Sequence, residues 1–446
     1  MTLANMSSLT AEISALRPFH SVGRIAGINR GTLSVSGLSQ SASFGDQVRI
    51  LWQPDQEMNG EVLQLSEDTI VVLPEQSAEG IAIGDRVILN GPTRIAPDDS
   101  WIGRVIDPSG NPLDGQPLLR GGTSRELRSA PPNATKRSPL GKRLETGIAT
   151  FNTLLPVVRG QRIGLFAGSG VGKSTLLAKF ANGIQADVVV IALIGERGRE
   201  VREFVDHTLG QDGMARSVVV AATSDQSPLL RRRCAWSAMA VAEHFRDQGA
   251  HVLLLADSVT RFAEAHREIA LASGEAASLR GYPPSTSHMI MSLCERAGTG
   301  TSETGDITAV LSVLVAGSDM EEPIADILRG VLDGHVVLDR TIAERGRYPA
   351  IDLLKSVSRS LPNAASENEN AIITKTRQLL GAYERAEMMI QAGLYNAGSD
   401  PTIDAAIEVW PALDAFLSED ETDNSQASFE RLSGILENVQ VPDTAS

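Results

Sequence analysis

The sequence predicts an α/β protein whose core is a mostly parallel β-sheet, preceded by a small β-barrel and followed by a helical domain. Three patterns support this fold class. Short β-type runs separated by turn signals fill residues 21–92, strand-like and helical stretches alternate through residues 93–368, and apolar residues recur at helical spacing in residues 369–446. Alternating strands and helices are typical of a parallel sheet covered by helices on both faces. Residues 1–20 form a separate segment ahead of the barrel.

The first 20 residues contain an apolar stripe. Leu3, Met6, Leu9, Ile13 and Leu16 recur every three or four residues, which places them on one face of a helix. A single helix of this length is marginally stable in water, so its stripe needs a partner. That partner is either the barrel that follows or another protein, and the pattern leaves both open. The segment lacks a basic start and a continuous apolar run, so we expect no signal peptide.

Six short β-type runs at nearly regular spacing predict the barrel. They are residues 22–26, 32–35, 47–51, 61–65, 69–73 and 85–89. Residues 21–92 hold four Lys/Arg against nine Asp/Glu, and Phe44 and Trp52 are their only aromatic residues. Binding of single-stranded nucleic acid needs a positive groove with aromatic stacking platforms. We therefore expect no nucleic-acid partner for this barrel.

The core is predicted from six apolar strands and a glycine-rich loop. The strands are residues 162–166, 188–194, 218–222, 252–256, 307–315 and 335–338. After the first strand, Ala167-Gly-Ser-Gly-Val-Gly-Lys-Ser-Thr175 matches the phosphate-loop pattern Gly-x-x-x-x-Gly-Lys-[Ser/Thr], apart from alanine in the first position. A helix-like run follows. A strand, loop and helix in this order favour a nucleotide-binding site over a plain glycine turn.

The loop also indicates what its residues do. Its glycines allow the backbone N–H groups to point inward around phosphate, at the positive end of the helix dipole. The expected nucleotide-binding residues are Gly168, Ser169, Gly170, Val171, Gly172, Lys173, Ser174 and Thr175. Lys173 can reach the β- and γ-phosphates, and the Ser174 hydroxyl can ligate Mg²⁺.

Two carboxylates follow buried strands, at the sheet edge where open parallel sheets bind ligands. Asp257 ends the apolar run that starts at His251, so it is a candidate Mg²⁺ ligand, directly or through a water. Its alternative role is a helix N-cap. Glu196 ends the run that starts at Val188 and can activate an attacking water. Its alternative is a solvated charge cluster.

Composition narrows the class of protein further. The formal net charge is −15 and the pI is about 5.0, which argues against a general nucleic-acid binder. Residues 418–446 contain seven Asp/Glu and one Arg, so an acidic and mobile end is expected. The sequence contains no run of 18 or more apolar residues, so we expect no membrane-spanning helix. Cys234 and Cys294 form no disulfide or metal-binding pattern, which suits a reducing cytoplasm.

Six further motifs carry a family resemblance. They are Gly195-Glu-Arg-Gly-Arg-Glu-Val201, Thr223-Ser-Asp-Gln-Ser-Pro-Leu-Leu230, Leu255-Ala-Asp-Ser-Val-Thr-Arg261, Gly281-Tyr-Pro-Pro284, Glu295-Arg-Ala-Gly298 and Tyr348-Pro-Ala-Ile-Asp352. In this order they resemble the flagellar and type III secretion export ATPases, which are relatives of the rotary ATP synthase catalytic subunits. The resemblance runs from the barrel to about residue 363 and continues weakly into the helical end. It implies a RecA-like P-loop core that hydrolyses ATP with Mg²⁺.

The resemblance also implies roles for single residues. The catalytic glutamate of the family falls on Glu196, its Walker lysine on Lys173 and its Walker B aspartate on Asp257. Arg197 and Arg261 match supporting positions near the phosphates. All five lie in the segment that follows the phosphate loop or in the loop itself.

Two more positions match residues that act at the ends of the nucleotide. Tyr348 corresponds to the residue whose ring packs on adenine. Arg359 corresponds to the arginine finger that reaches the γ-phosphate bound by a neighbouring subunit. Its alternative role is an ordinary surface arginine in a salt bridge.

The family resemblance further implies partners and a location. It predicts a homohexameric ring at the base of the export apparatus, cytoplasmic and peripheral to the inner membrane, that releases substrates from chaperones and feeds the export gate. The N-terminal helix would dock a stator-like regulatory protein. The chain departs from the family pattern at Asn152, Thr286 and Ser287. These departures leave flagellar or injectisome membership open, although we favour the flagellar branch.

Three other functions share part of this pattern. A catalytic subunit of an F-type or V-type ATP synthase needs a partner chain for its arginine finger, whereas Glu196 and Arg359 occur here on one chain. An RNA translocase of the transcription-terminator type has the same barrel and core, but the acidic barrel disfavours it. A non-catalytic ring subunit would lack the carboxylate at Glu196.

Overall fold

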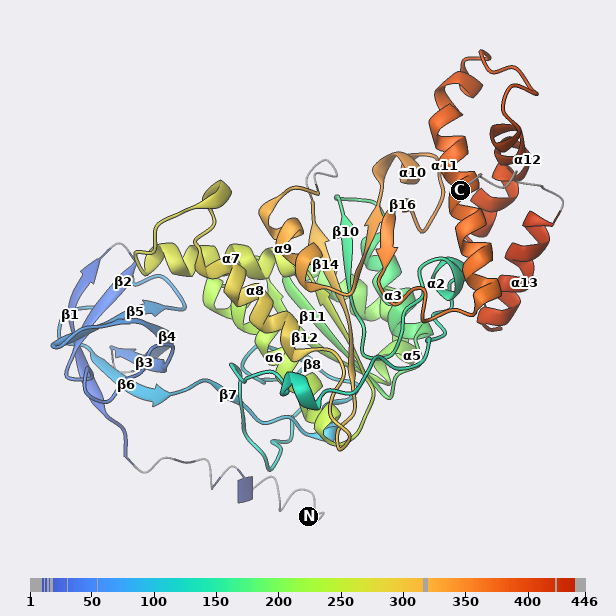
Figure 1. Ribbon diagram of the computed structural model, residues 1–446. Helices are drawn as coiled ribbons and strands as arrows, with labels where there is room; N and C mark the ends of the chain where they lie inside the picture. Colours follow the sequence, from blue (N-terminus) through green and yellow to red (C-terminus); the bar gives the residue numbers. More distant parts are fainter. Residues whose placement is uncertain are drawn as a thin grey trace.

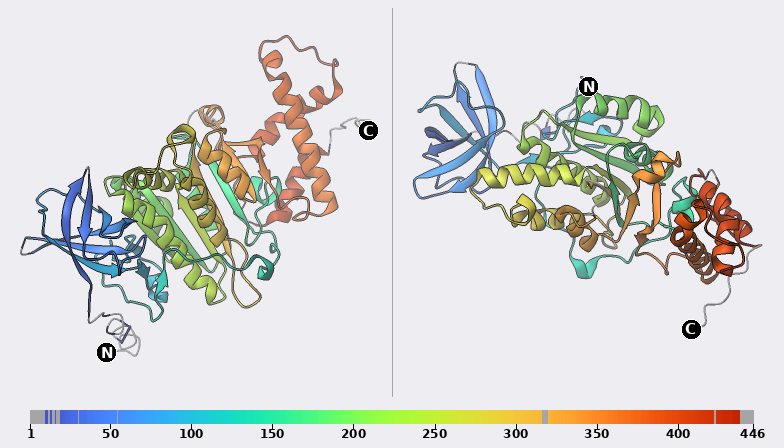
Figure 2. Two further views of the ribbon diagram at one scale, coloured as in Figure 1. Left: turned by 60° about the vertical axis from the view of Figure 1, so that its left-hand side comes forward. Right: turned by 90° about the horizontal axis from the view of Figure 1, so that it is seen from above.

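The computed structural model describes residues 10, 11, 13, 16, 19–29, 31–53, 55–315, 320–421 and 423–437. A barrel, an α/β core and a helical domain follow one another along the molecule (Figure 1). The further views in Figure 2 also place the core between the other two parts. The expected N-terminal helix rests mainly on Leu3, Met6 and Leu9, which lie outside the described residues, so it stays a prediction. The side chains of Ile13 and Leu16 are exposed.

Six antiparallel strands form the predicted barrel. They are β1 (Val22–Asn29), β2 (Thr32–Ser36), β3 (Gln47–Trp52), β4 (Gln56–Leu65), β5 (Thr69–Pro74) and β6 (Arg86–Gly91). They close in the order β1-β2-β5-β4-β3-β6. Buried and partly exposed residues alternate along β2, β3 and β5, because successive side chains of a strand point inside and outside a barrel. The six strands predicted from the sequence therefore form the expected barrel.

An eight-stranded sheet forms the core, in the order β16-β15-β10-β14-β13-β11-β12-β8. Its strands are β8 (Val105–Ile106), β10 (Arg162–Ala167), β11 (Val188–Glu196), β12 (Ser217–Thr223), β13 (Val252–Asp257), β14 (Ile307–Leu314), β15 (Gly334–Leu338) and β16 (Ile351–Ser358). All neighbours are parallel except β15 and β16. The six predicted core strands are confirmed, whereas β8 and β16 were not predicted. The short strands β7 (Arg94–Ile95) and β9 (Arg125–Glu126) pair separately.

Helices cover both faces of this sheet. One apolar layer joins the sheet to α2 (Ala149–Thr153), α3 (Lys173–Gly183) and the C-terminal helices, and the other joins it to α6 (Pro228–Asp247), α7 (Val259–Ala272), α8 (Ser285–Arg296) and α9 (Pro323–Val331). Along β11, Val189 and Ile191 face the first layer while Val190 and Ala192 face the second. Both faces of a strand are buried in such a sheet, which explains the continuous apolar runs.

Several short helices complete the core. They are α4 (Gly198–Glu203), a π-helix (Phe204–Leu209), α5 (Gly210–Met214), α10 (Arg340–Glu344) and 3₁₀ turns at Asp99–Trp101, Ala134–Lys136 and Leu279–Gly281. The segment from α4 to α5 follows β11 directly, so it lies beside the end of the strand that carries Glu196.

The C-terminal domain contains α11 (Glu367–Gln391), α12 (Pro401–Phe416) and α13 (Ser425–Leu436). A capping box formed by Ser366 and Glu369 starts α11. The expected mobile acidic end is wrong for α13, because Phe429, Leu432 and Leu436 are buried in the same apolar cluster as the core. Burial of these three apolar side chains stabilises α13 and offsets the repulsion among the acidic residues of this segment.

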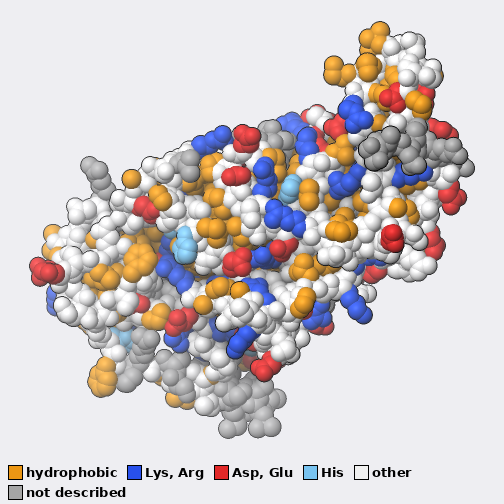
Figure 3. All heavy atoms as spheres, in the orientation of Figure 1, with side chains coloured by type: hydrophobic (Ala, Val, Ile, Leu, Met, Phe, Trp, Pro, Cys, Tyr) orange, Lys and Arg blue, Asp and Glu red, His pale blue; other side chains and the backbone are white. Residues whose placement is uncertain are grey.

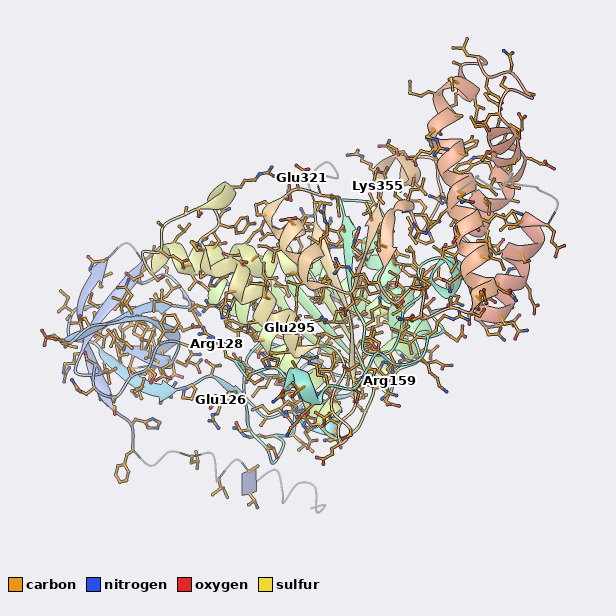
Figure 4. The ribbon with its side chains drawn as sticks, viewed as in Figure 1. Glu126, Arg128, Arg159, Glu295, Glu321 and Lys355 are labelled. Carbon is orange, nitrogen blue, oxygen red and sulfur yellow. The ribbon has the colours of Figure 1, made fainter. Side chains whose placement is uncertain are left out.

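Buried ion pairs join the barrel to the core. Glu61 of the barrel accepts a hydrogen bond of 2.6 Å from Arg232, and both side chains are at least 95% buried. Arg128, labelled at this junction in Figure 4, also donates to Glu61. The neighbouring Arg233 pairs with Glu75 at 2.7 Å. Two charges taken out of water need such partners, so this junction is held in a defined geometry.

Candidate active site

The phosphate loop follows β10 and leads directly into α3. Gly170 and Gly172 have φ angles of 78° and 86°, in the left-handed region that residues with a Cβ rarely adopt. Gly172 is the N-cap of α3 and carries no side chain that could occupy the helix end. The free N–H groups of the first turn of α3 therefore face outward, as anion binding at a helix N-terminus requires.

A cavity of about 430 Å³ opens over this loop. Its walls are formed by Gly168, Ser169, Gly170, Gly172, Lys173, Ser174, Thr175, Gly195, Glu196, Arg197, Glu200, Ser224, Arg261 and Leu314. Seven of the eight predicted loop residues line it; the exception is Val171, whose side chain is buried in the core beneath the loop. The cavity is large enough for a phosphate chain with its associated waters.

Lys173 and Asp257 form an ion pair below the cavity. Ser312 on β14 donates a hydrogen bond of 2.6 Å to the same Asp257 oxygen. The Asp257 side chain is only 6% exposed, and a buried carboxylate requires such partners. Lys173 thus has a local counter-ion, from which an incoming phosphate can draw it away.

Glu196 is aimed into the site by a β-bulge. The pairing of β11 with β12 shifts register between Ile194 and Glu196, and the intervening Gly195 has φ 69°. Bulges redirect side chains at strand ends. Burial and the nearby Asp257 raise the pKa of Glu196 to about 7, against the opposing effect of Lys173. This carboxyl can therefore change protonation state near neutral pH.

Two arginines reach the cavity from neighbouring elements. Arg197, at the start of α4, donates a hydrogen bond of 2.8 Å to Glu200. Arg261 on α7 donates to Glu264 at 3.0 Å. Both line the cavity and both keep part of their guanidinium groups exposed, so they can contact a bound anion.

Tyr348 lies against the phosphate loop although it is far away in sequence. A Cβ placed on Gly172 would come within 3.1 Å of the Tyr348 ring. The tyrosine remains 49% exposed, so one part of its ring contacts the loop and another faces solvent. The segment between α10 and β16 thus places an aromatic surface next to the phosphate cavity.

Arg359 lies at the opposite edge of the sheet. It follows β16, and its N–H donates to the carbonyl of Asp333, just before β15. Asp333 also binds Arg162, the first residue of β10, whereas the phosphate loop begins after the last residue of that strand. At about 3.3 Å per residue, β10 separates the two positions by roughly 20 Å. Arg359 therefore cannot reach the cavity of its own chain.

Comparison with known proteins gives the site its context. Residues 147–358 match the model of the ATP synthase alpha/beta family, nucleotide-binding domain, and residues 365–433 match the T3SS EscN ATPase C-terminal domain. The flagellum-specific ATP synthase of Caulobacter vibrioides is 43% identical over 442 residues, which cover 97% of this chain and 99% of that protein. This chain belongs to the flagellar and type III secretion ATPase family. The Salmonella typhimurium relative is 43% identical over 94% of this chain and 93% of its own length.

Solved structures of export ATPases have the same fold. The assembled ATPase EscN of the enteropathogenic E. coli type III secretion system aligns with a TM-score of 0.86 at 36% identity, covering 93% of this chain and 100% of EscN. EscN in complex with its central stalk EscO aligns with a TM-score of 0.83. The predicted fold class and the predicted ATPase family are confirmed.

Some polar groups of this ATPase site were not predicted. Ser312 lies inside a buried strand, where a lone serine gives no sequence signal. Glu200 belongs to the recognised motif but was given no role of its own, although it lines the cavity and binds Arg197. Ser224 also lines the cavity, and its N–H donates to the carbonyl of Glu196. Only the folded chain brings these residues to Glu196.

The donors present fit Mg²⁺ held jointly with a nucleotide. Among the described residues, no group of three or more His, Cys, Asp or Glu side chains could hold a metal ion without further ligands. Ser174 and Asp257 both line a neighbouring cavity of about 250 Å³, where they supply oxygen donors. Mg²⁺ characteristically takes one or two protein oxygens and completes its shell with phosphate oxygens and waters. In the described part of the chain, no helix is long and apolar enough to cross a bilayer.

Proposed function

We propose that this protein is a Mg²⁺-dependent ATPase that works as a homohexameric ring and energises protein export through the flagellar or type III secretion apparatus. The observation that carries the proposal is the separation of Arg359 from the phosphate cavity. One chain supplies Lys173, Glu196 and Asp257 at one sheet edge and Arg359 at the other. A ring of identical subunits can bring these two edges together at each interface.

Each residue then has a defined task in hydrolysis. Lys173 leaves Asp257 to bind the β- and γ-phosphates of ATP, and the N-terminus of α3 supplies backbone N–H donors. Glu196, when ionised, orients the attacking water and takes its proton. Arg359 of a neighbouring subunit stabilises the charge that develops on the transferred phosphoryl group.

Other residues of the site hold the nucleotide and its metal. The Tyr348 ring packs on the adenine base. Ser174 and Asp257 hold Mg²⁺, which neutralises phosphate charge when bound. Arg197 and Arg261 give additional positive charge at the cavity wall.

Rival functions receive less support. In an RNA translocase the barrel would stack bases on aromatic residues, but Trp52 is buried inside it and Phe44 is the only other aromatic residue of residues 21–92. On the face shown in Figure 3, positive and negative side chains are interspersed, without a continuous positive band over the barrel. In a heteromeric ATP synthase a second kind of subunit would supply the finger, whereas Arg359 is present here.

The flagellar branch is favoured over the injectisome branch. The Caulobacter vibrioides and Bacillus subtilis flagellum-specific relatives are 43% and 45% identical, against 36% for EscN. This protein would then lie in the cytoplasm, peripheral to the inner membrane. There it would receive chaperone–substrate complexes and pass substrates to the export gate.

A concentration series tests the ring. ATPase rate per subunit is measured against protein concentration, and mass photometry follows assembly in the same samples. We expect the rate per subunit to rise with the hexamer population. A rate independent of assembly would contradict the shared active site.

The phosphate loop is tested by Lys173→Ala. The change removes the mobile positive charge for the β- and γ-phosphates, so hydrolysis should be lost and ATP binding weakened. Lys179→Ala is a matched control, because Lys179 is on the same helix but pairs with the exposed Asp420. Near-normal turnover in Lys173→Ala would contradict the ATPase assignment.

The N-terminal segment is tested by deleting residues 1–17. If its stripe docks a stator-like protein, the deletion removes that protein from a pull-down and leaves basal ATPase activity unchanged. A fall in thermal stability of many degrees with unchanged partner binding would instead assign the stripe to the core.

A further inference from the structure

A cavity of about 210 Å³ lies where the core meets the C-terminal helices. On the core side it is lined by α10, β16 and the chain that connects them, and on the other side by α11 and α12, which stand beside them in Figure 1. Among the described residues, it shares no lining side chain with the phosphate cavity. It has room for one small molecule or several waters, since a water occupies about 30 Å³ in the liquid.

Arg347 brings a buried positive charge to this cavity. Its side chain lines the wall and is only 9% exposed. Nη2 donates to the carbonyl of Ile351 at 2.8 Å, and Nε lies 3.4 Å from an oxygen of Asp414. Neither Nε nor Nη1 has a hydrogen-bond partner among the described residues. An unpaired buried donor is costly, above all on a charged group, so Arg347 is positioned to receive an oxygen acceptor from a molecule in the cavity.

The walls carry more acidic than basic side chains. Three cations, Arg345, Arg347 and Lys355, face five carboxylates, Asp339, Asp352, Glu384, Glu387 and Asp414. Arg345 pairs with Glu387 at 2.8 Å. Lys355, labelled in Figure 4, lies 2.8 Å from Asp352 and 3.7 Å from Asp339, so two carboxylates share it. The surplus of negative charge attracts a positive group and opposes a ligand that is only an anion.

The remaining wall of the cavity is apolar. Leu353 of β16 and Leu380 of α11 line it and are buried. Tyr383 and Trp410 also line it, and their rings stack on each other with centroids 4.0 Å apart. Ligand sites typically combine such an apolar lining with a few polar groups that fix orientation. A ligand with an apolar part can therefore be buried against these side chains.

We propose that this cavity binds a free α-amino acid with an apolar side chain. The carboxylate of the ligand accepts hydrogen bonds from Arg347, and its ammonium group lies toward Glu384, an exposed residue of the cavity wall. The side chain of the ligand packs on Leu353 and Leu380. Because a zwitterion has no net charge, it pairs Arg347 without adding to the acidic surplus. A phosphate adds to that surplus, and an amine without a carboxylate leaves Arg347 unpaired.

The bound amino acid joins two parts of the molecule. It contacts α11 of the helical domain and, through Arg347, the segment that continues into Tyr348. Since both walls exist only in the folded protein, the ligand stabilises the folded state by mass action. The site goes beyond the ATPase function proposed above and uses none of its residues, so binding is measured without nucleotide.

The test measures binding of L-leucine, L-methionine and L-phenylalanine to the full-length protein by titration calorimetry and by the unfolding temperature. Two analogues of leucine each lack one charged group: L-leucinamide has no carboxylate and 4-methylpentanoate has no ammonium group. Arg347→Met and Glu384→Gln remove the two proposed partners. Arg340→Met and Glu344→Gln are matched controls, because these exposed residues of α10 pair with each other at 2.9 Å and do not line the cavity.

We expect at least one of the three amino acids to bind and to raise the unfolding temperature of the wild type. Arg347→Met should weaken that binding about 10- to 100-fold, because it removes a buried, charged hydrogen-bond donor. Glu384→Gln should weaken it about two- to fivefold, because exposed ion pairs are weak. Both analogues should bind less tightly than leucine, leucinamide should not distinguish Arg347→Met from wild type, and the two control variants should match wild type.

Other results would overturn the amino-acid site. Failure of all three amino acids to bind up to their solubility limits means that the cavity holds water only. Equal affinities of leucine and leucinamide, or unchanged binding to Arg347→Met, place any binding elsewhere. If Arg347→Met does not fold, the two analogues and Glu384→Gln still decide the question. Loss of ATPase activity has no bearing on these measurements, so failure of the proposed function is recognised separately.

Discussion

The two edges of the central sheet carry different parts of the candidate active site. At the carboxyl edge, Lys173 and Glu196 line the phosphate cavity, and Asp257 forms an ion pair with Lys173. At the amino edge, Arg359 is exposed, and its guanidinium donates only to the carbonyl of Arg329 in the hydrogen bonds found among the described residues. Figure 4 labels Lys355, which lies within β16, and Arg159, which precedes β10.

The two edges therefore have different tasks. The carboxyl edge is built to bind a nucleotide without help, because its charges are already balanced and its loop is shaped. At the amino edge, no salt bridge to the Arg359 guanidinium is found within the described part of the chain, where it donates to the carbonyl of Arg329. If the edges act together, changes at the carboxyl edge should affect binding or chemistry in every subunit, whereas changes at the amino edge should affect only assembled interfaces.

The largest expected effect comes from the amino edge. Arg359→Ala should leave the monomer folded and able to bind ATP but lower the assembled rate by about 10³–10⁵, because a finger acting in trans stabilises transition-state charge. The measurement is kcat of the assembled ring, beside ATP binding to the monomer. Arg359→Lys serves as control for charge alone, since lysine lacks the planar fork.

A mixing experiment sharpens the same comparison. Rings assembled from Arg359→Ala and Glu196→Gln subunits contain some interfaces with an intact Glu196 and an intact Arg359. These interfaces should recover activity that neither parent has. If mixed rings form and remain as inactive as the parents, Arg359 does not act across the interface.

The next effect lies at the carboxyl edge. Glu196→Gln should keep ATP and Mg²⁺ binding but lower kcat by about 10²–10⁴, because the amide preserves shape and loses the base. Single-turnover hydrolysis and equilibrium ATP binding separate the two quantities. A loss of less than about tenfold would mean that Glu196 is not the general base but part of a solvated charge cluster.

A smaller effect follows from the raised pKa of Glu196. The base must be ionised to act, so kcat/KM should fall as pH drops through about 7. One pH unit below that midpoint, about a tenfold loss is expected from a single titration. The measurement is kcat/KM from pH 5 to 9 at saturating Mg²⁺, with assembly checked at each pH. An acid limb near the ordinary glutamate value would contradict the buried setting of this carboxyl.

The sequence predicted the carboxyl edge better than the amino edge, for a physical reason. Apolar runs that end in Glu196 and Asp257 identify buried parallel strands, and glycine spacing identifies the loop between β10 and α3. Both signals are local. The position of Arg359 depends on β16, whose Ile351–Ser358 run mixes charged and apolar residues because one of its faces is partly exposed. Its antiparallel pairing with β15 arises from long-range packing, which local patterns do not specify.

The smallest effect should come from Tyr348, which lies beside the phosphate loop but far from the reacting atoms. Tyr348→Ala removes the aromatic surface, and a stacking contact of about 0.5–1.5 kcal/mol corresponds to roughly a 2- to 12-fold rise in KM for ATP. The value of kcat and the concentration needed for assembly should stay unchanged, in contrast to Arg359→Ala. Tyr348→Phe keeps the ring against Gly172 and should behave as wild type. A lower kcat with unchanged KM would mean that Tyr348 stabilises the phosphate loop and does not bind the adenine ring.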